Sequence, residues 1–225
     1  MVLDRESLRN GSFLEAFRNK PDIEWWSEER IERSMHEVLK ERVGNEPLWI
    51  FAYGSLIFNP LFEVQECSPA MLCGWHRSFC IRLVIARGNP EFPGRMLALE
   101  PGGVCEGIAL RLREEGLEEE LRMVWTREMV GGGYQPGWTK IQLADGRKVR
   151  AIFFAADLNS KLYEKQTAPE SIAPLIACAS GNIGTNQDYV FNLEAALRQY
   201  HIVDAGVNDL ASRLRTICKT AEVSR

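Results

Sequence analysis

The chain has 225 residues, enough for one sizeable domain or two small ones. Hydrophobic residues make up 45% and charged residues 26% of it, the balance of a globular protein that buries a core. The net charge of −4 comes without a basic stripe, which argues against nucleic acid as a partner. No apolar run reaches the length of a membrane span, so no membrane partner is expected either.

Six cysteines are spread along the chain without a C-x-x-C pair, and the polar start "MVLDRESLRN" lacks the apolar core of a secretory signal. These features predict reduced thiols and a cytoplasmic location. Cys67, Cys73 and Cys80 bracket His76, which leaves zinc binding or a papain-like Cys–His pair as alternatives. Incidental thiols are the favoured interpretation, because the spacing lacks a zinc knuckle, and no metal site is predicted.

Residues 1–46 predict a helical N-terminal extension. Ser27 followed by two glutamates is typical of a helix start, and apolar residues then recur at helical spacing (Ile31, Met35, Val38 and Leu39). We expect this extension to pack on the main body as an amphipathic arm, with the Trp25–Trp26 pair stapling it there. A helix that binds a partner is the alternative.

From residue 47 onward the apolar period becomes that of strands. The segments "LWIFAY", "SFCIRLVIA", "RMLALE", "VCEGIALRLR", "WTKIQLA" and "KVRAIFFAA" each predict one strand. Pro101–Gly102–Gly103 is expected to separate the third from the fourth, and Asp145–Gly146 to join the last two as a hairpin. This pattern predicts a small, largely antiparallel barrel within one α+β domain over residues 47–225.

Three helices are expected around this sheet. One interrupts the strands at about residues 114–130, and two close the chain, starting near Thr185 and near Asn208. Ser180–Gly181 and Gly184–Thr185–Asn186 predict a loop and a helix cap before the first of these two.

Glu128 is the strongest candidate for chemistry. Leu121, Val124 and Trp125 define an apolar face of the helix at 114–130, and three further residues along this face lead to Glu128, while Arg127 is expected to point elsewhere. Burial and the negative helix end both raise a carboxyl pKa, which suits a group that takes and returns a proton.

The alternative for Glu128 is a structural acid paired with Arg77, Arg82 or Arg95. Gly131–Gly132–Gly133 ends the helix directly after it and leaves open backbone where a ligand could approach. Tyr134 then supplies an aromatic ring with a hydrogen-bonding tip.

A second candidate is the loop Tyr53–Gly54–Ser55–Leu56, which ends the first strand. Its backbone N–H groups could bind a carboxylate or an oxyanion, with Tyr53 and Leu56 as walls. The loop lacks the length and the lysine of a P-loop, so nucleotide binding is not predicted. A turn without a ligand is the alternative.

The motifs "FAYGSLIFNP", "GWHRSFC", "PGRMLALE", "WTREM" with "GGGY", and "SGNIGTNQDYVFNLE" occur in one order. From residue 47 to the end, this order resembles the ChaC family of γ-glutamylcyclotransferases, the glutathione-specific branch. The resemblance implies an α+β fold, a γ-glutamylcyclotransferase-like small mixed β-barrel with flanking helices. It implies conversion of glutathione to 5-oxoproline and cysteinylglycine, without a metal or an organic cofactor.

By this resemblance, the catalytic glutamate falls on Glu128 and the substrate loop on Tyr53, Gly54, Ser55 and Leu56. The family's Gly–Tyr falls on Gly133 and Tyr134, and Tyr189 in "NQDY" is a further pocket residue. Here three glycines precede the tyrosine, whereas shorter family members place it nearer the glutamate.

Two alternative functions remain open. One is a cyclotransferase for other γ-glutamyl amines or amino acids, because the loop and Glu128 serve only the shared γ-glutamyl half. The other is a non-catalytic regulator that binds γ-glutamyl groups, against which a buried base argues. Nothing in the sequence indicates an oligomeric state.

Overall fold

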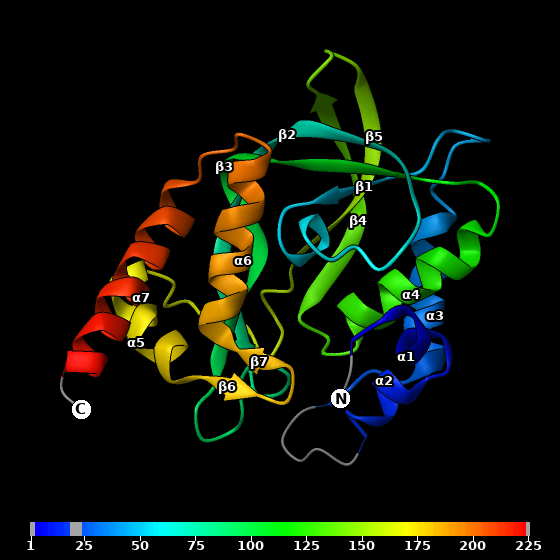
Figure 1. The fold of residues 1–225 in the computed structure, drawn as a ribbon. Helices are drawn as coiled ribbons and strands as arrows, with labels where there is room; N and C mark the ends of the chain where they lie inside the picture. Colours follow the sequence, from blue (N-terminus) through cyan, green and yellow to red (C-terminus); the bar gives the residue numbers. More distant parts are fainter. Residues whose placement is uncertain (1–2, 19–23, 224–225) are drawn as a thin grey trace.

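The computed structural model describes residues 3–18 and 24–223. The strands of the larger sheet are β1 (Trp49–Ala52), β2 (Val64–Leu83), β3 (Gly94–Leu112), β4 (Tyr134–Leu143) and β5 (Lys148–Ala156). They close into a barrel in the order β1-β3-β2-β4-β5, and β1 pairs in parallel with β5 to complete it (Figure 1). The predicted α+β fold with a small mixed barrel is therefore confirmed.

The expected break at Pro101–Gly102–Gly103 is wrong, because β3 runs through it as one strand. Its partner β2 carries an irregularity at the same level, between Cys73 and Trp75. Gly102 and Gly103 have φ of 108° and 74°, which other residues adopt only with strain. These glycines let the long β2–β3 ladder bend without ending it, as a bulge does.

The hairpin predicted at Asp145–Gly146 joins β4 to β5, with Gln142 opposite Lys148. Gly146 has φ 89°, and the Leu143 N–H donates to the Arg147 carbonyl at 2.8 Å. The positive φ of the glycine allows this tight connection.

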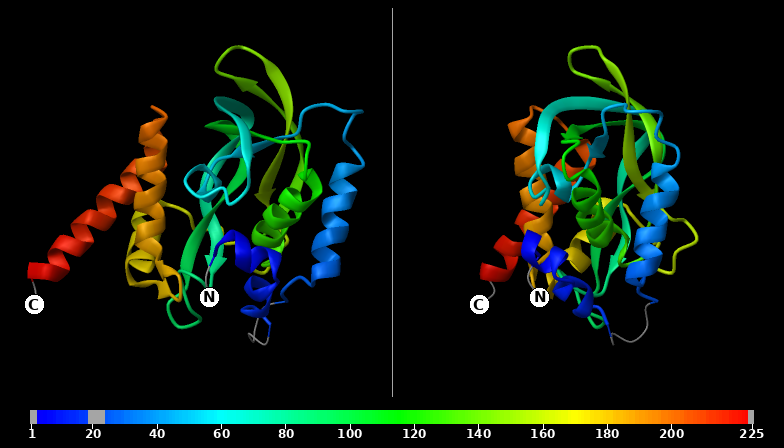
Figure 2. Two further views of the ribbon diagram at one scale, coloured as in Figure 1. Left: turned by 45° about the vertical axis from the view of Figure 1, so that its right-hand side comes forward. Right: turned by 90° about the vertical axis from the view of Figure 1, so that its right-hand side faces the viewer.

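Helices flank two sides of the barrel (Figures 1 and 2). On one side lie α5 (Pro169–Cys178), α6 (Asn186–Gln199) and α7 (Ala205–Val223), and on the other lie α3 (Glu28–Leu39) and α4 (Leu117–Met129). Thr185 caps α6 as expected, whereas α7 begins before the predicted start near Asn208. Sequence reasoning missed α5, which holds Pro174 inside it, and the short strands β6 (Ser180–Gly181) and β7 (Gly184–Thr185).

Residues 3–18 and 24–46 form the N-terminal arm, with α1 (Arg5–Arg9), α2 (Ser12–Glu15) and α3. The Ser27 side chain caps α3 by accepting from the Arg30 N–H at 3.3 Å. The arm packs on the body through Trp138, whose Nε1 donates to the Val38 carbonyl at 2.8 Å. The Trp26 N–H donates to the Val130 carbonyl at 3.0 Å, directly after α4. The arm is thus fastened beside the helix that carries Glu128.

No helix in residues 3–18 and 24–223 combines the length and the apolar character that crossing a membrane requires.

Candidate active site

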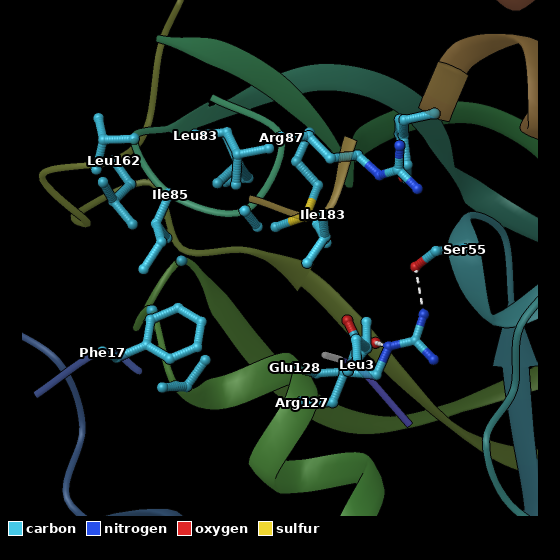
Figure 3. Close-up of a pocket in the computed structure, with 18 of the residues that line it drawn as sticks. Leu3, Phe17, Ser55, Leu83, Ile85, Arg87, Arg127, Glu128, Leu162 and Ile183 are labelled. Atoms are coloured by element: carbon cyan, nitrogen blue, oxygen red, sulfur yellow. Dashed lines mark hydrogen bonds and ion pairs between the residues drawn. The ribbon is translucent and has the colours of Figure 1, made fainter. Parts of the chain in front are cut away.

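A cavity lies where the loop after β1, the C-terminal end of α4 and the end of β2 meet. Figure 3 shows that Ser55, Arg87, Arg127 and Glu128 form one side of it. The other side is apolar and includes Phe17, Leu83, Ile85 and Leu162. The cavity therefore has one charged end and one apolar end, and a single ligand could contact both.

The carboxylate of Glu128 lies at the charged end. Its helix buries Leu121, Val124 and Trp125 on one face, as the spacing predicted, and the Glu128 side chain is only 11% exposed. Its Oε1 is buried and accepts no hydrogen bond from the described part of the chain. Burial raises the pKa of this carboxyl above its ordinary value, and the Arg127 guanidinium lowers it in part.

Arg127 corrects an expectation, because it lines the cavity instead of pointing elsewhere. Its Nη2 donates to the Ser55 hydroxyl at 2.7 Å, and its Nη1 donates to the Asn59 carbonyl. Its Nε lies 3.1 Å from Glu128 Oε1, at an angle that makes an ion pair without a hydrogen bond. The long arginine side chain turns back from the last helical turn, which helical spacing alone does not predict.

The three arginines considered as structural partners of Glu128 lie elsewhere. Arg77 pairs with Asp204 at 3.1 Å, and Arg95 with Glu164 at 3.5 Å. Arg82 lines the cavity, and its guanidinium forms no ion pair within the described ranges. The only cation at Glu128 in these ranges is Arg127.

The Gly54–Ser55 loop turns directly into the short 3₁₀ helix Ser55–Ile57. The first N–H groups of such a helix have no acceptor within it. Arg77 fixes the start of the loop, since its Nε donates to the Tyr53 carbonyl at 2.7 Å. A Cβ added to Gly54 would lie 3.2 Å from the Tyr189 hydroxyl, so the loop and α6 approach closely at this glycine.

Two tyrosine hydroxyls of the site donate hydrogen bonds to backbone carbonyls. Tyr53 donates to the Phe154 carbonyl at 2.5 Å, and Tyr134 donates to the Leu97 carbonyl at 2.8 Å. Burial raises the pKa of both, and of Tyr189, above the ordinary tyrosine value. All three hydroxyls are therefore protonated at neutral pH.

The structure brings five of the predicted site residues to the cavity wall: Ser55, Glu128, Gly133, Tyr134 and Tyr189. Tyr53, Gly54 and Leu56 are not part of this wall. Tyr53 and Leu56 are each 6% exposed and support the loop from behind.

Sequence reasoning missed several residues of the cavity. Arg87 follows the end of β2, where no periodic pattern marks it, and its Nη1 donates to the Thr185 carbonyl at 2.9 Å. The N-terminal arm also contributes to the wall, through Leu3, Phe13, Phe17 and Trp25. Neighbouring aromatic residues in an arm predict packing, and they do not by themselves predict which surface is covered.

The cysteines around His76 have separate partners or none. His76 Nδ1 lies 3.1 Å from the Gly102 carbonyl, and Cys67 Sγ lies 3.5 Å from the Tyr200 hydroxyl. Cys80 is buried and Cys73 is exposed. Burial raises the pKa of the Cys80 thiol to about 12, which opposes a role as a thiolate ligand or nucleophile.

Residues 48–217 match the family model described as ChaC-like protein. The chain belongs to the ChaC-like family. It is 46% identical over 209 residues to the glutathione-specific γ-glutamylcyclotransferase of Escherichia coli K12, covering 93% of this chain and 90% of the relative. It is 33% identical to the γ-glutamylcyclotransferase 2-3 of Arabidopsis thaliana, covering 78% of this chain and 92% of the relative.

The fold agrees with that membership. A solved structure of a glutathione-specific γ-glutamyl cyclotransferase from yeast superposes with a TM-score of 0.70 at 20% identity. The superposition covers 76% of this chain and 97% of that one. The family model begins at residue 48, so the N-terminal arm lies outside the matched region.

Proposed function

We propose that this protein is a γ-glutamylcyclotransferase that cleaves glutathione to 5-oxoproline and cysteinylglycine. The observation that carries the proposal is the buried Glu128 carboxylate at the charged end of a cavity that also holds Ser55. Its Oε1 is ion-paired with Arg127 but accepts no hydrogen bond from the described residues. An unsatisfied buried acceptor is costly for folding alone. The glutathione-specific name of the E. coli relative supports the choice of substrate.

The reaction needs a proton acceptor more than it needs a nucleophilic side chain. The α-amine of the γ-glutamyl group attacks its own γ-carbonyl, forming the ring C–N bond, and the amide bond to the cysteinyl nitrogen breaks. The amine is largely protonated at neutral pH, so Glu128 accepts its proton and then returns one to the departing nitrogen. Both reacting groups sit in one molecule, and correct positioning supplies much of the acceleration.

The charged end of the cavity suits the γ-glutamyl half. The guanidinium groups of Arg87 and Arg127 lie on the same side as the Ser55 hydroxyl (Figure 3). They offer positive charge to the α-carboxylate. The backbone N–H groups of the loop at Ser55, which lines the cavity, stabilise either this carboxylate or the oxyanion that develops at the γ-carbonyl. Tyr134 and Tyr189 wall the same region.

A direct assay tests the proposal. Purified protein is incubated with glutathione, and released 5-oxoproline and cysteinylglycine are measured together. Equal amounts of the two products are the expected result. Release of 5-oxoproline only from another compound, such as γ-glutamylalanine, would assign the protein to other γ-glutamyl amines. Tight binding of glutathione without any release would assign it to the non-catalytic class.

The free thiols support a location in a reducing compartment such as the cytoplasm. All six cysteines fall within the described residues, and each is free. Disulfide-free cysteines are typical of proteins in such compartments, where glutathione itself is kept reduced.

A further inference from the structure

A second pocket adjoins the catalytic cavity and shares part of its wall, namely Arg82, Val84, Gly131 and Leu162. Its other walls come from the N-terminal arm (Glu24, Trp26 and Arg30) and from the turn after β5, including Asp157 and Lys161. We call it the adjoining pocket. Arg82 therefore belongs to the wall of the cavity beside Glu128 and to the wall of a more polar space.

The adjoining pocket carries unpaired positive charge. Its wall holds three cations, Arg30, Arg82 and Lys161, against two acids, Glu24 and Asp157. Glu24 pairs with Arg30 at 3.1 Å, and Asp157 accepts from the Asn159 N–H at 3.0 Å. The Arg82 guanidinium and the Lys161 ammonium make no hydrogen bond or ion pair with any described residue. A half-buried arginine without a partner is a ready site for an anion.

The register of the barrel adds to this excess. Arg82 lies directly opposite Arg95 in the β2–β3 ladder, so two like charges share one face of the sheet. Within the described ranges, the ion-pair partner of Arg95 is Glu164, at 3.5 Å, and the Arg95 Nε is buried without a hydrogen bond. Burial lowers the pKa of Arg95, Glu164 raises it, and Arg82 lowers it further. Glu164 thus pairs with Arg95, and Arg82 beside it has no carboxylate partner among the described residues.

Arg82 is also held in a fixed relation to Glu128. Its backbone N–H donates to the Leu162 carbonyl at 2.7 Å, and Ile81 beside it bridges to Tyr163. A Cβ added to Gly133 would lie 3.2 Å from Ile81, so the segment that follows α4 packs directly on this part of β2. The backbone that carries Arg82 is therefore packed against the segment that follows Glu128.

We propose that Arg82 binds the C-terminal carboxylate of the leaving cysteinylglycine and so determines specificity for the leaving half of the substrate. The inference rests on the proposed function, because the γ-glutamyl group must first occupy the end of the cavity beside Glu128. The leaving dipeptide then extends along the cavity toward Arg82, reaching about 7 Å when extended. Trp26 and Arg30 of the arm close the far side of the adjoining pocket.

The test compares two substrates that differ only in this carboxylate: glutathione and its glycine monoethyl ester. Release of 5-oxoproline is measured for wild type, Arg82→Gln, Arg82→Lys and Arg113→Gln. Arg113 is an exposed arginine that pairs with Glu63 and lines neither pocket. Arg113→Gln therefore removes the same charge as Arg82→Gln without changing either pocket. Wild type and Arg113→Gln are expected to prefer glutathione over the ester by about tenfold or more in kcat/KM, mainly through KM.

Arg82→Gln is expected to lose this preference, with kcat/KM for glutathione falling to about that for the ester. Arg82→Lys should keep a large part of it, which also shows that the site tolerates substitution. A full preference for glutathione in folded Arg82→Gln would overturn the inference. Failure of wild type to release 5-oxoproline from either substrate would instead overturn the proposed function.

Discussion

Arg127 donates a hydrogen bond from Nη2 to the Ser55 hydroxyl at 2.7 Å, joining the helix that carries Glu128 to the loop that follows β1. Its Nη1 donates to the Asn59 carbonyl on the same loop, and its side chain is only 6% exposed. One buried side chain therefore joins Glu128, the proposed proton acceptor, to the proposed substrate loop, and its charge also lowers the pKa of Glu128.

Arg127→Gln tests this double role. Without the guanidinium, the pKa of Glu128 rises further, because Arg127 lowers it in the wild type. A base works only when deprotonated, so the acid limb of the pH–kcat/KM profile should move to higher pH. The pH profile of 5-oxoproline release measures this. The matched control is Arg122→Gln on the exposed face of the same helix, whose profile should overlay that of the wild type.

Glu128→Gln should abolish turnover while leaving the fold intact. The amide keeps the size of the side chain but cannot accept the amine proton, so kcat should fall about 100-fold or more. Glu118→Gln is the control, because Glu118 lies on the exposed face of α4 and pairs with Arg122. Circular dichroism checks folding for both. Full 5-oxoproline production by folded Glu128→Gln protein would rule out Glu128 as the proton carrier.

The same substitution should stabilise the protein at neutral and alkaline pH. Burial raises the folded-state pKa of Glu128 above its value in the unfolded chain, so the folded state holds this proton more tightly. The stability that results is present below the ordinary glutamate pKa and is lost as the pH rises through the raised pKa. The glutamine side chain does not titrate, so Glu128→Gln does not lose this stability as the pH rises. Its Tm advantage over wild type should therefore grow from pH 5 to pH 8, and a constant difference would contradict the assignment.

The sequence predicted Glu128 and missed Arg127 for one physical reason. Helical spacing fixes the direction of each Cα–Cβ bond, and a glutamate on an apolar face has little freedom to leave it. An arginine can turn back by several ångströms, so its end point depends on acceptors such as Ser55 and Asn59, which come from another element.

The strand predictions likewise succeed where the signal is local and fail where contacts with another element decide the structure. Each predicted strand segment overlaps an observed strand, and Asp145–Gly146 correctly predicted the hairpin, because both signals are local. The prediction missed residues 64–77 of β2. Pro101–Gly102–Gly103 carries the local signal of a turn, yet pairing with the long β2 keeps it within a strand. Tertiary pairing also decides that the N-terminal arm lines the cavity, which periodicity within the arm does not reveal.

Gly132→Ala should weaken the packing of the N-terminal arm against the end of α4. Gly132 has φ 62°, and an added Cβ would lie 2.5 Å from Nε1 of Trp26, whose ring is held under the Arg30 guanidinium. Gly44→Ala is the matched control, because its φ of 54° is similar and nothing lies within 4 Å of the added atom. The control should lose about 1–2 kcal/mol in the free energy of unfolding, from backbone strain alone.

Gly132→Ala should lose more than this control, because the clash with Trp26 adds to the same strain. Urea unfolding monitored by tryptophan fluorescence gives both values. Since Gly132 lies between Glu128 and Tyr134, the displaced backbone should also lower kcat/KM for glutathione, whereas Gly44→Ala should leave it unchanged. Equal losses of stability in the two variants would show that the Trp26 side chain moves away at no cost. The packing of the arm against the end of α4 would then contribute nothing to stability.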